Sequence, residues 1–268
     1  MHPEFDYIKI NRDSWNQRTE AHINSSFYNL PDFKQGVSSL NEIELVLLGD
    51  IKGKSILHLQ CHFGQDSISL SRMGAHVTGV DLSDKAIDQA CILAKELNVD
   101  TEFICCNIYD LPQHLNQKFD IVFTSYGTIG WLPDLNAWAK IVSQYLKPKG
   151  QFIFVEFHPV VWMFDDDFEN IGYNYFNEKA IVETEQGTYA DRKADLTLKH
   201  ITWNHPLSEV FGSLLKENLE IKSFNEFDYS PYNCFNKTIE IAPNKFRIAH
   251  LSNKIPMVYA LVAEKSSI

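Results

Sequence analysis

The sequence predicts an α/β fold: a doubly wound, mostly parallel sheet with helices on both faces. Short apolar runs alternate with helix-like segments between residues 55 and 157, which is typical of such a sheet. The first run is followed by a tight turn and a helix, and the second run ends on an acidic residue. The 268 residues are enough for one large domain, or for one domain that carries a cap.

The stretch 55–81 is the first strand–helix–strand unit of the predicted sheet. Ile56–Leu59 is an apolar run too short for a helix, as expected of a strand that is buried on both faces. After a turn, Asp66 or Ser67 is expected to cap a short helix, and Gly74 is expected to end it.

The second strand, residues 76–80, ends on Asp81, which lies 17 residues beyond Gly64. In doubly wound sheets an acid at a similar offset, about 20 residues, accepts hydrogen bonds from ribose hydroxyl groups. The N–H groups of the turn and of the helix N-terminus then face the ligand. The unit therefore predicts a nucleotide-binding site at the carboxyl ends of the first two strands.

The remaining elements follow from apolar runs, capping residues and helix breakers. In chain order we expect a helix from Ser83 or Asp84 to about Leu97, strands at Thr101–Cys106 and Phe119–Phe123, a helix ending at Leu146, a strand at Gln151–Phe157, a helix at Ser208–Asn218, and strands at Glu220–Tyr229 and Pro256–Glu264. Two β-like runs, Ala180–Glu185 and Leu196–Trp203, predict a hairpin inserted after the fifth strand.

These residues resemble the class I S-adenosylmethionine-dependent methyltransferases. The string Leu59–Ser67, LQCHFGQDS, is similar to the first loop of a bacterial subgroup of that family. The resemblance covers residues 49–157 and 208–264, and implies a seven-stranded Rossmann-like sheet with an antiparallel last strand. It also implies S-adenosyl-L-methionine as the cofactor, with S-adenosyl-L-homocysteine as the product.

The family's first loop usually reads acid-x-Gly-x-Gly-x-Gly. On this chain the acid becomes His58, the first two glycines become Gln60 and His62, and only Gly64 remains. A glycine permits positive φ, whereas a residue with a β-carbon pays roughly 1–2 kcal/mol there. The chain also lacks the carboxylate that would help to hold the ammonium group of the cofactor, because a neutral histidine brings no charge.

The resemblance places the cofactor against the first loop, the end of the second strand and two later loops. The residues it implies are His58, Gln60, Cys61, His62, Gly64, Asp66, Asp81, Leu82, Asn107, Ile108, Ser125 and Tyr126. Asn107 would lie beside the adenine, although an asparagine after a strand is also a common turn former.

Methyl transfer from a sulfonium is a direct displacement, so holding the acceptor in line with the methyl group supplies much of the catalysis. A general base is needed only if the acceptor must lose a proton. Tyr126, Glu156 and His158 lie at the carboxyl ends of strands four and five, where ligands bind in this architecture. We predict His158 and Tyr126 as the catalytic residues, with a structural Phe-His-Pro turn as the alternative for His158.

The chain divides into three predicted regions. Residues 1–48 form an N-terminal helical lid, residues 49–159 and 208–268 form the core, and residues 160–207 form an inserted, aromatic-rich cap. Aromatic walls suit a small-molecule pocket, and four aromatic side chains are expected to line it: Trp15, Trp131, Trp162 and Phe164. The alternatives are that Trp15 is a core anchor and that the cap is a homodimer contact.

Composition narrows the function classes. With 24 Lys and Arg against 35 Asp and Glu, a net charge of −11 argues against nucleic acid as a partner. We expect neither a signal peptide at residues 1–6 nor a membrane span, because no apolar run is long enough. Five cysteines without regular spacing suit a reducing compartment, so the expected location is cytoplasmic. The sequence contains no C-x-x-C spacing, so we expect no metal site.

The sequence therefore predicts a methyltransferase that acts on a small-molecule acceptor. One alternative is an NAD(P)-dependent oxidoreductase, because the same strand–helix–strand–acid unit serves both ligands. It is disfavoured because residues 60–66 lack the glycines that let a pyrophosphate approach the backbone. The other alternative is a protein that binds the cofactor without turnover, and the altered first loop motivates it.

Overall fold

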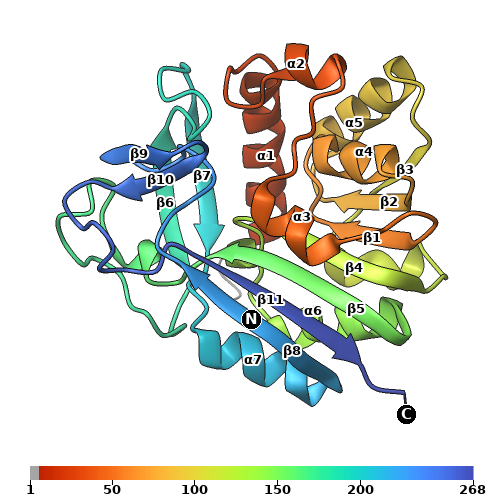
Figure 1. Cartoon of the computed structure of the whole chain (residues 1–268). Helices are drawn as coiled ribbons and strands as arrows, with labels where there is room; N and C mark the ends of the chain where they lie inside the picture. The colour runs from red at the N-terminus through yellow and green to blue at the C-terminus, as the bar shows by residue number, and fades with distance from the viewer. Residues whose placement is uncertain (1–5, 268) are drawn as a thin grey trace.

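The structure, a computed structural model, describes residues 6–267; residues 1–5 of the predicted lid and residue 268 lie outside the described part. Its centre is a seven-stranded sheet with the order β3-β2-β1-β4-β5-β11-β8 (Figure 1). The strands are β1 (Ser55–Leu59), β2 (His76–Asp81), β3 (Thr101–Cys105), β4 (Phe119–Ser125), β5 (Leu146–Phe157), β8 (Leu219–Phe227) and β11 (Val258–Lys265). β11 is antiparallel to both of its neighbours, which confirms the predicted fold.

Helices cover both faces of this sheet. They are α1 (Tyr7–Ile23), α2 (Leu30–Lys34), α3 (Glu42–Leu48), α4 (Gln65–Arg72), α5 (Asp84–Glu96), α6 (Leu135–Tyr145) and α7 (Leu207–Lys216), with short 3₁₀ turns η1 (Ile108–Gln113), η2 (Ile129–Trp131) and η3 (Val161–Met163). α6 and α7 share one apolar core with the sheet, whereas α3 and α4 belong to cores on the opposite face. The five-residue α2 was not predicted, because so short a helix has no apolar periodicity to detect.

The start of α4 differs from the prediction. We expected Asp66 or Ser67 as the cap, but the helix begins at Gln65 and its N-cap is Gly64, in a left-handed conformation. Asp66 therefore lies in the first turn, where its side chain is free to face a ligand. The predicted cap of α5 is correct, because the Ser83 hydroxyl accepts a hydrogen bond from the Ala86 N–H at 3.0 Å.

The parallel register brings three strand ends to one edge of the sheet. Leu59 of β1 pairs with Val80 of β2, and His58 pairs with Phe123 of β4. The strands are buried and apolar, so their loops emerge together on the same side. This edge is where ligands bind in doubly wound sheets.

Two hairpins lie outside the sheet, β6 (Ile181–Gln186) with β7 (Thr197–Thr202) and β9 (Thr238–Ala242) with β10 (Lys245–Ile248). Figure 1 shows them together on one side of α1, with α4 and α5 on the other side. The buried Asn11 side chain of α1 donates to the Ile201 carbonyl at 2.8 Å and accepts from its N–H at 2.9 Å. α1 therefore joins the β6–β7 hairpin to the core.

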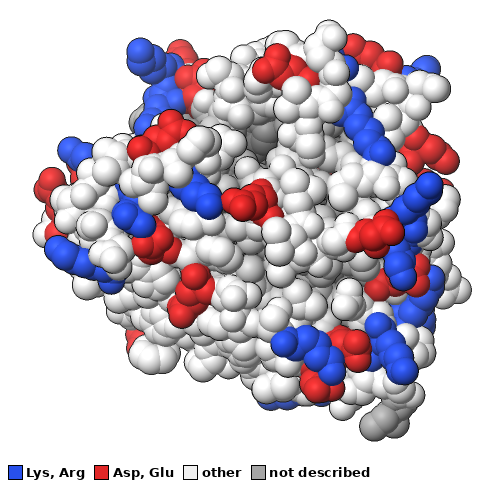
Figure 2. All heavy atoms as spheres, viewed as in Figure 1, with Lys and Arg blue, Asp and Glu red and all other residues white. Residues whose placement is uncertain are grey.

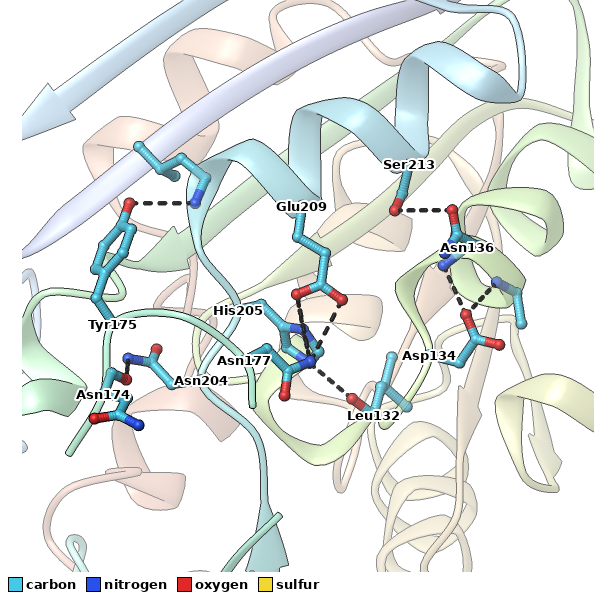
Figure 3. Close-up of polar contacts among 12 residues, drawn as sticks. Leu132, Asp134, Asn136, Asn174, Tyr175, Asn177, Asn204, His205, Glu209 and Ser213 are labelled. Atoms are coloured by element: carbon cyan, nitrogen blue, oxygen red, sulfur yellow. Dashed lines mark hydrogen bonds and ion pairs between the residues drawn. The ribbon is translucent and has the colours of Figure 1, made fainter. Parts of the chain in front are cut away.

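The chain returns from the hairpin to α7 through a buried polar cluster (Figure 3). The fully buried His205 side chain donates from Nε2 to the Leu132 carbonyl at 2.8 Å, and its Nδ1 faces Glu209 at 3.0 Å. Asn204 donates to the carbonyl of Asn174 at 3.0 Å. These contacts fix the base of the insertion against the core.

Charged side chains are dispersed over the surface. On the face shown in Figure 2, Lys and Arg side chains are interspersed with Asp and Glu side chains, and no large patch of one sign covers that face.

Candidate functional site

A cavity of about 990 Å³ lies between the carboxyl ends of β1, β2 and β4, the helix α1 and the β6–β7 hairpin. This volume suits a cofactor or a small-molecule ligand. Every predicted site residue except His158 contributes to its wall: His58, Gln60, Cys61, His62, Gly64, Asp66, Asp81, Leu82, Asn107, Ile108, Ser125, Tyr126, Trp15, Trp131, Trp162 and Phe164.

The first loop keeps the backbone of a glycine-rich loop with only one glycine. Gln60 has φ +55°, His62 has φ +51° and Gly64 has φ +81°. All three lie in the left-handed region, which costs a residue with a β-carbon roughly 1–2 kcal/mol. The two side chains make compensating contacts: Gln60 Nε2 donates to the Thr128 carbonyl at 2.8 Å, and His62 Nε2 lies 3.0 Å from His22 Nδ1.

Gly64 cannot carry a side chain. A Cβ at this position would lie 2.7 Å from the Phe103 ring and 2.9 Å from the Ala90 Cβ. The loop therefore needs a glycine at position 64, the third glycine position of the family pattern, for helix–strand packing as well as for its φ angle. This explains why this glycine remains while the first two positions carry side chains.

Asp81 is held by the backbone of the first loop. Its Oδ2 accepts from the His62 N–H at 2.8 Å, and its Oδ1 accepts from the Ser83 N–H at 2.8 Å. Burial raises the pKa of this carboxyl to about 6. Each oxygen has a further lone pair, so the carboxylate can also accept two ligand hydroxyl groups, as a ribose would require.

Burial shifts the pKa values of His58 and Asp66 in opposite directions, and in each case it favours the neutral form. His58 Nδ1 lies 2.7 Å from the Ser67 hydroxyl, and burial lowers the pKa of the imidazole to about 3, so it is neutral. Asp66 accepts from the Ser125 hydroxyl at 3.4 Å. Burial raises the pKa of Asp66 to about 7, and the charge of Glu44 adds to this effect.

The third-strand loop supplies a further part of the wall. Asn107 Oδ1 accepts from the Tyr109 N–H at 3.2 Å, so its side chain caps η1 as a turn former does. Ile108 is buried beside it, and Leu82 lines the same cavity. These residues give the cavity an apolar edge next to Asp81.

The structure places two of the three candidate bases on the cavity wall, but both side chains are already engaged. The Tyr126 hydroxyl donates to Glu44 at 2.8 Å. Glu156, which is 2% exposed, accepts from the N–H groups of Gly127, Thr128 and Ile129, with distances of 2.7 and 3.1 Å for the last two. Glu156 therefore anchors the loop after β4 and is not placed to act as a base.

His158 lies away from the cavity wall. The chain continues to pair beyond β5, with the His158 N–H donating to the Met257 carbonyl at 2.9 Å. This pairing directs the imidazole toward β8, where Nε2 lies 3.0 Å from Glu226, and Nδ1 accepts from the Val160 N–H at 3.2 Å. The prediction of His158 as a base at this site is therefore corrected, and the structural turn accounts for the residue.

The four predicted pocket aromatics lie on two different walls. The Trp15 and Trp131 rings are 5.1 Å apart, and the Arg18 guanidinium lies 5.7 Å from each. Trp162 packs 5.7 Å from Phe235, and Phe164 stacks 5.6 Å from Phe168. The first pair belongs to the α1 side of the cavity and the second to the inserted segment.

Sequence reasoning missed several residues that complete the wall. The hydroxyls of Tyr28 and Tyr189 lie 2.5 Å apart, although 161 residues separate them in sequence. His22 does not itself line the cavity but contacts His62, which does. Burial lowers the pKa of His22 to about 2 and that of His62 to about 3, so this pair is neutral. His22 was signalled by the buried face of α1, whereas no local pattern marks Tyr28 or Tyr189.

Two further features bear on the site. Within residues 6–267, no group of three or more His, Cys, Asp or Glu side chains is arranged to hold a metal ion. No helix in the described part of the chain is long and apolar enough to cross a membrane.

Residues 56–150 match the family model of a methyltransferase domain. Two curated relatives are named ubiquinone biosynthesis O-methyltransferase. The one from Idiomarina loihiensis is 32% identical over 122 residues, which are 43% of this chain and 50% of that protein. The one from Coxiella burnetii is 34% identical over 104 residues, 39% of this chain and 44% of that protein. The chain thus spans about half the length of the curated relatives it matches.

Solved structures extend the likeness beyond that segment. An S-adenosylmethionine-dependent methyltransferase from Mesorhizobium loti has a TM-score of 0.58 at 20% identity and covers 87% of this chain and 100% of its own. Magnesium protoporphyrin IX methyltransferase from Synechocystis PCC 6803, with bound SAH, has a TM-score of 0.56 at 15% identity, covering 97% and 100%. At these identities the likeness establishes the fold alone.

Proposed function

We propose that this chain, whose residues 56–150 match the family model of a methyltransferase domain, transfers a methyl group from S-adenosyl-L-methionine to a small-molecule acceptor bound in the cavity. One observation carries the proposal. In the first loop every second residue from Gln60 to Gly64 has a left-handed backbone, although two of these three residues are not glycines. The His62 N–H of this loop donates a hydrogen bond to the Asp81 carboxylate. A loop that retains this strained backbone is preorganised for a ligand.

The cavity residues at the carboxyl ends of β1, β2, β3 and β4, which we call the core wall, fit the cofactor. Asp81 would accept the ribose hydroxyls, Ile108 and Leu82 would pack against the adenine, and Asn107 lies at the same edge. When bound, the cofactor supplies an electrophilic methyl group on a sulfonium. The chain's own residues then bind it, orient the acceptor and exclude water from the cavity.

The chain's contribution to the transfer is alignment. Tyr126 and Glu156 already hold hydrogen bonds on the cavity wall, so we assign no proton transfer to either. Alignment of two reactants is itself worth several kcal/mol, about 7–11 in the most favourable intramolecular cases. The ties between Asn11 and Ile201 and between Arg18 and Glu185 hold α1 against the hairpin and close one side of the cavity.

The printed names of the relatives guide the choice of acceptor. Because they are O-methyltransferases, hydroxyl-bearing small molecules are the first acceptors to screen. The screen would follow transfer of a labelled methyl group from S-adenosyl-L-methionine into a metabolite extract. Release of S-adenosyl-L-homocysteine that depends on the acceptor would exclude a protein that only binds the cofactor.

Calorimetric titration with S-adenosyl-L-homocysteine tests the cofactor assignment. We expect saturable binding, with no binding of NADH under the same conditions. No detectable binding at millimolar S-adenosyl-L-homocysteine would overturn the proposal, and saturable binding of NADH alone would favour an oxidoreductase.

A further inference from the structure

Two carboxylates meet at one end of the cavity. Asp66, in the first turn of α4, lies on the wall and accepts from the Ser125 hydroxyl at 3.4 Å. Glu44 of α3 is fully buried behind it and accepts from the Tyr126 hydroxyl at 2.8 Å. This end of the cavity therefore holds two carboxyl groups whose hydrogen-bond donors are neutral hydroxyls.

No positive side chain on the described part of the wall offsets Asp66. Two arginines line the cavity, and both are engaged elsewhere: Arg18 binds Glu185 at 2.7 Å, and Arg192 donates to the Phe235 carbonyl at 2.8 Å. The described wall contains no lysine. A buried carboxylate without a cationic partner is costly, and the raised pKa of Asp66 reflects that cost.

Asp66 lines the same cavity as His58, the position that lacks an acid. His58 stands at the end of β1, and its Nδ1 lies 2.7 Å from the hydroxyl of Ser67, the residue after Asp66. The neutral His58 imidazole cannot balance a cation, whereas the Asp66 carboxylate on the same cavity wall can. The charge missing at the strand end is thus present on the first turn of α4.

We infer that Asp66 binds the α-ammonium group of the cofactor in this chain, in place of an acid at position 58. The inference rests on the proposed function, because it requires a ligand that carries an α-amino acid group. An ammonium group has three N–H donors, which match the Asp66 carboxylate and the Ser125 hydroxyl. A further acceptor lies on the same loop: Gln60 Oε1 is buried and has no partner among the described residues.

A competing role for Asp66 is that of a general base for the acceptor. A base acts on the transfer step, so its loss would lower kcat and leave the binding of the cofactor product intact. An ammonium partner acts on binding and only on ligands that carry the ammonium group. The two roles therefore predict different results with ligands that differ only in this group.

The test compares two ligands on wild type and Asp66→Asn. S-adenosyl-L-homocysteine carries the ammonium group, whereas 5′-methylthioadenosine shares the adenosine and thioether but lacks the amino acid. We expect Asp66→Asn to bind S-adenosyl-L-homocysteine about ten- to a hundredfold more weakly, the range for a lost charge-assisted bond, and to bind 5′-methylthioadenosine within about twofold of wild type. Asp81→Ala is the matched control, because it should weaken both ligands, which share the ribose.

The outcomes separate the inference from the proposed function. Wild type that binds neither ligand would overturn both. Wild type that binds S-adenosyl-L-homocysteine while Asp66→Asn binds it equally well would overturn the inference alone, as would equal weakening of both ligands by Asp66→Asn. The asparagine is isosteric and removes a buried unpaired charge, so the variant is expected to fold.

Proton release is an independent readout. The titratable groups that face Asp66 are Glu44 of α3, Tyr28 after α1, Cys61 of the first loop, Tyr126 after β4 and Tyr232 before β9. Burial raises the pKa of each tyrosine and of Cys61, so these groups stay neutral near pH 7. A bound ammonium would lower the pKa of Asp66, so binding near pH 7 should release a proton that Asp66→Asn does not release. Calorimetry in buffers of different ionisation enthalpy measures this release, and the same release from Asp66→Asn would contradict the inference.

Discussion

Two walls of the cavity are built in different ways: the core wall, formed by residues at the carboxyl ends of β1, β2, β3 and β4, and the cap wall, formed by α1, the β6–β7 hairpin and residues 161–168. On the core wall, the contact between His62 and Asp81 joins residues 19 apart in sequence. On the cap wall, the contacts that hold α1 to the hairpin join Asn11 to Ile201 across 190 residues, and Arg18 to Glu185 across 167. The Asp81 side of the core wall is thus set by a contact between residues near in sequence, whereas the cap wall depends on the packing of segments far apart in sequence.

The largest expected effect is on the core wall, at Gly64. In Gly64→Ala the new Cβ would meet the Phe103 ring at 2.7 Å at a φ of +81°. Left-handed strain of about 1–2 kcal/mol and overpacking of about 1–3 kcal/mol add up to a loss of about 2–5 kcal/mol in the free energy of unfolding. Chemical denaturation measures this loss.

Gly53→Ala is the control for that substitution. Gly53 has a similar φ of +74°, but a Cβ there would have nothing within 4 Å. We expect only the strain, about 1–2 kcal/mol. Equal losses in the two variants would show that Gly64 is needed for its φ angle alone.

The next effect concerns Asp81. Asp81→Ala removes the carboxylate that would accept the ribose hydroxyls, so the affinity for S-adenosyl-L-homocysteine should fall about ten- to a hundredfold. Asp88→Ala, on the exposed face of α5, is the control and should bind normally.

Because burial raises the pKa of Asp81 to about 6 and the ionised form is the better acceptor, wild-type affinity should fall as the pH drops below about 6. Unchanged affinity in a folded Asp81→Ala protein would show that the ribose is held elsewhere.

A smaller effect is expected on the cap wall. Replacing both Trp162 and Phe164 with Ala should raise the KM of the acceptor about five- to tenfold, because binding that is equal in ground and transition states is lost. The affinity for S-adenosyl-L-homocysteine should stay within about twofold, since the core wall is untouched. A changed sedimentation coefficient with an unchanged KM would instead identify this surface as a homodimer contact.

The last effect is on stability at Asp66. Its pKa in the folded protein, about 7, exceeds the ordinary value of 3.8, so its contribution to stability is full below about pH 4 and is lost as the pH rises to about 7. The difference in melting temperature, Asp66→Asn minus wild type, should therefore be larger at pH 8 than at pH 5. A difference between the two proteins that does not change with pH would contradict this.

The same contrast explains what the sequence can predict. The second strand, the Ser83 cap and the place of Asp81 at the strand end follow from runs and caps a few residues long, and each is confirmed. The fifth strand is longer than predicted and begins at Leu146 instead of Gln151. The predicted cap of α4, Asp66 or Ser67, was wrong, because the left-handed Gly64 is the N-cap and the helix begins at Gln65.

Other contacts needed information that no short pattern contains. The direction of His158 depends on pairing with Met257, about a hundred residues later in the chain, and the Tyr28–Tyr189 contact links two loops. Pairwise contacts of this length are fixed by the tertiary fold and not by local propensity.

Hydrogen–deuterium exchange with and without S-adenosyl-L-homocysteine tests most directly whether the core wall holds the cofactor. We predict that the ligand slows exchange in peptides covering the first loop, residues 59–67, and the end of β2, residues 79–84, more than in the β6–β7 hairpin. Protection confined to the hairpin, with the first loop unchanged, would contradict this account of the site.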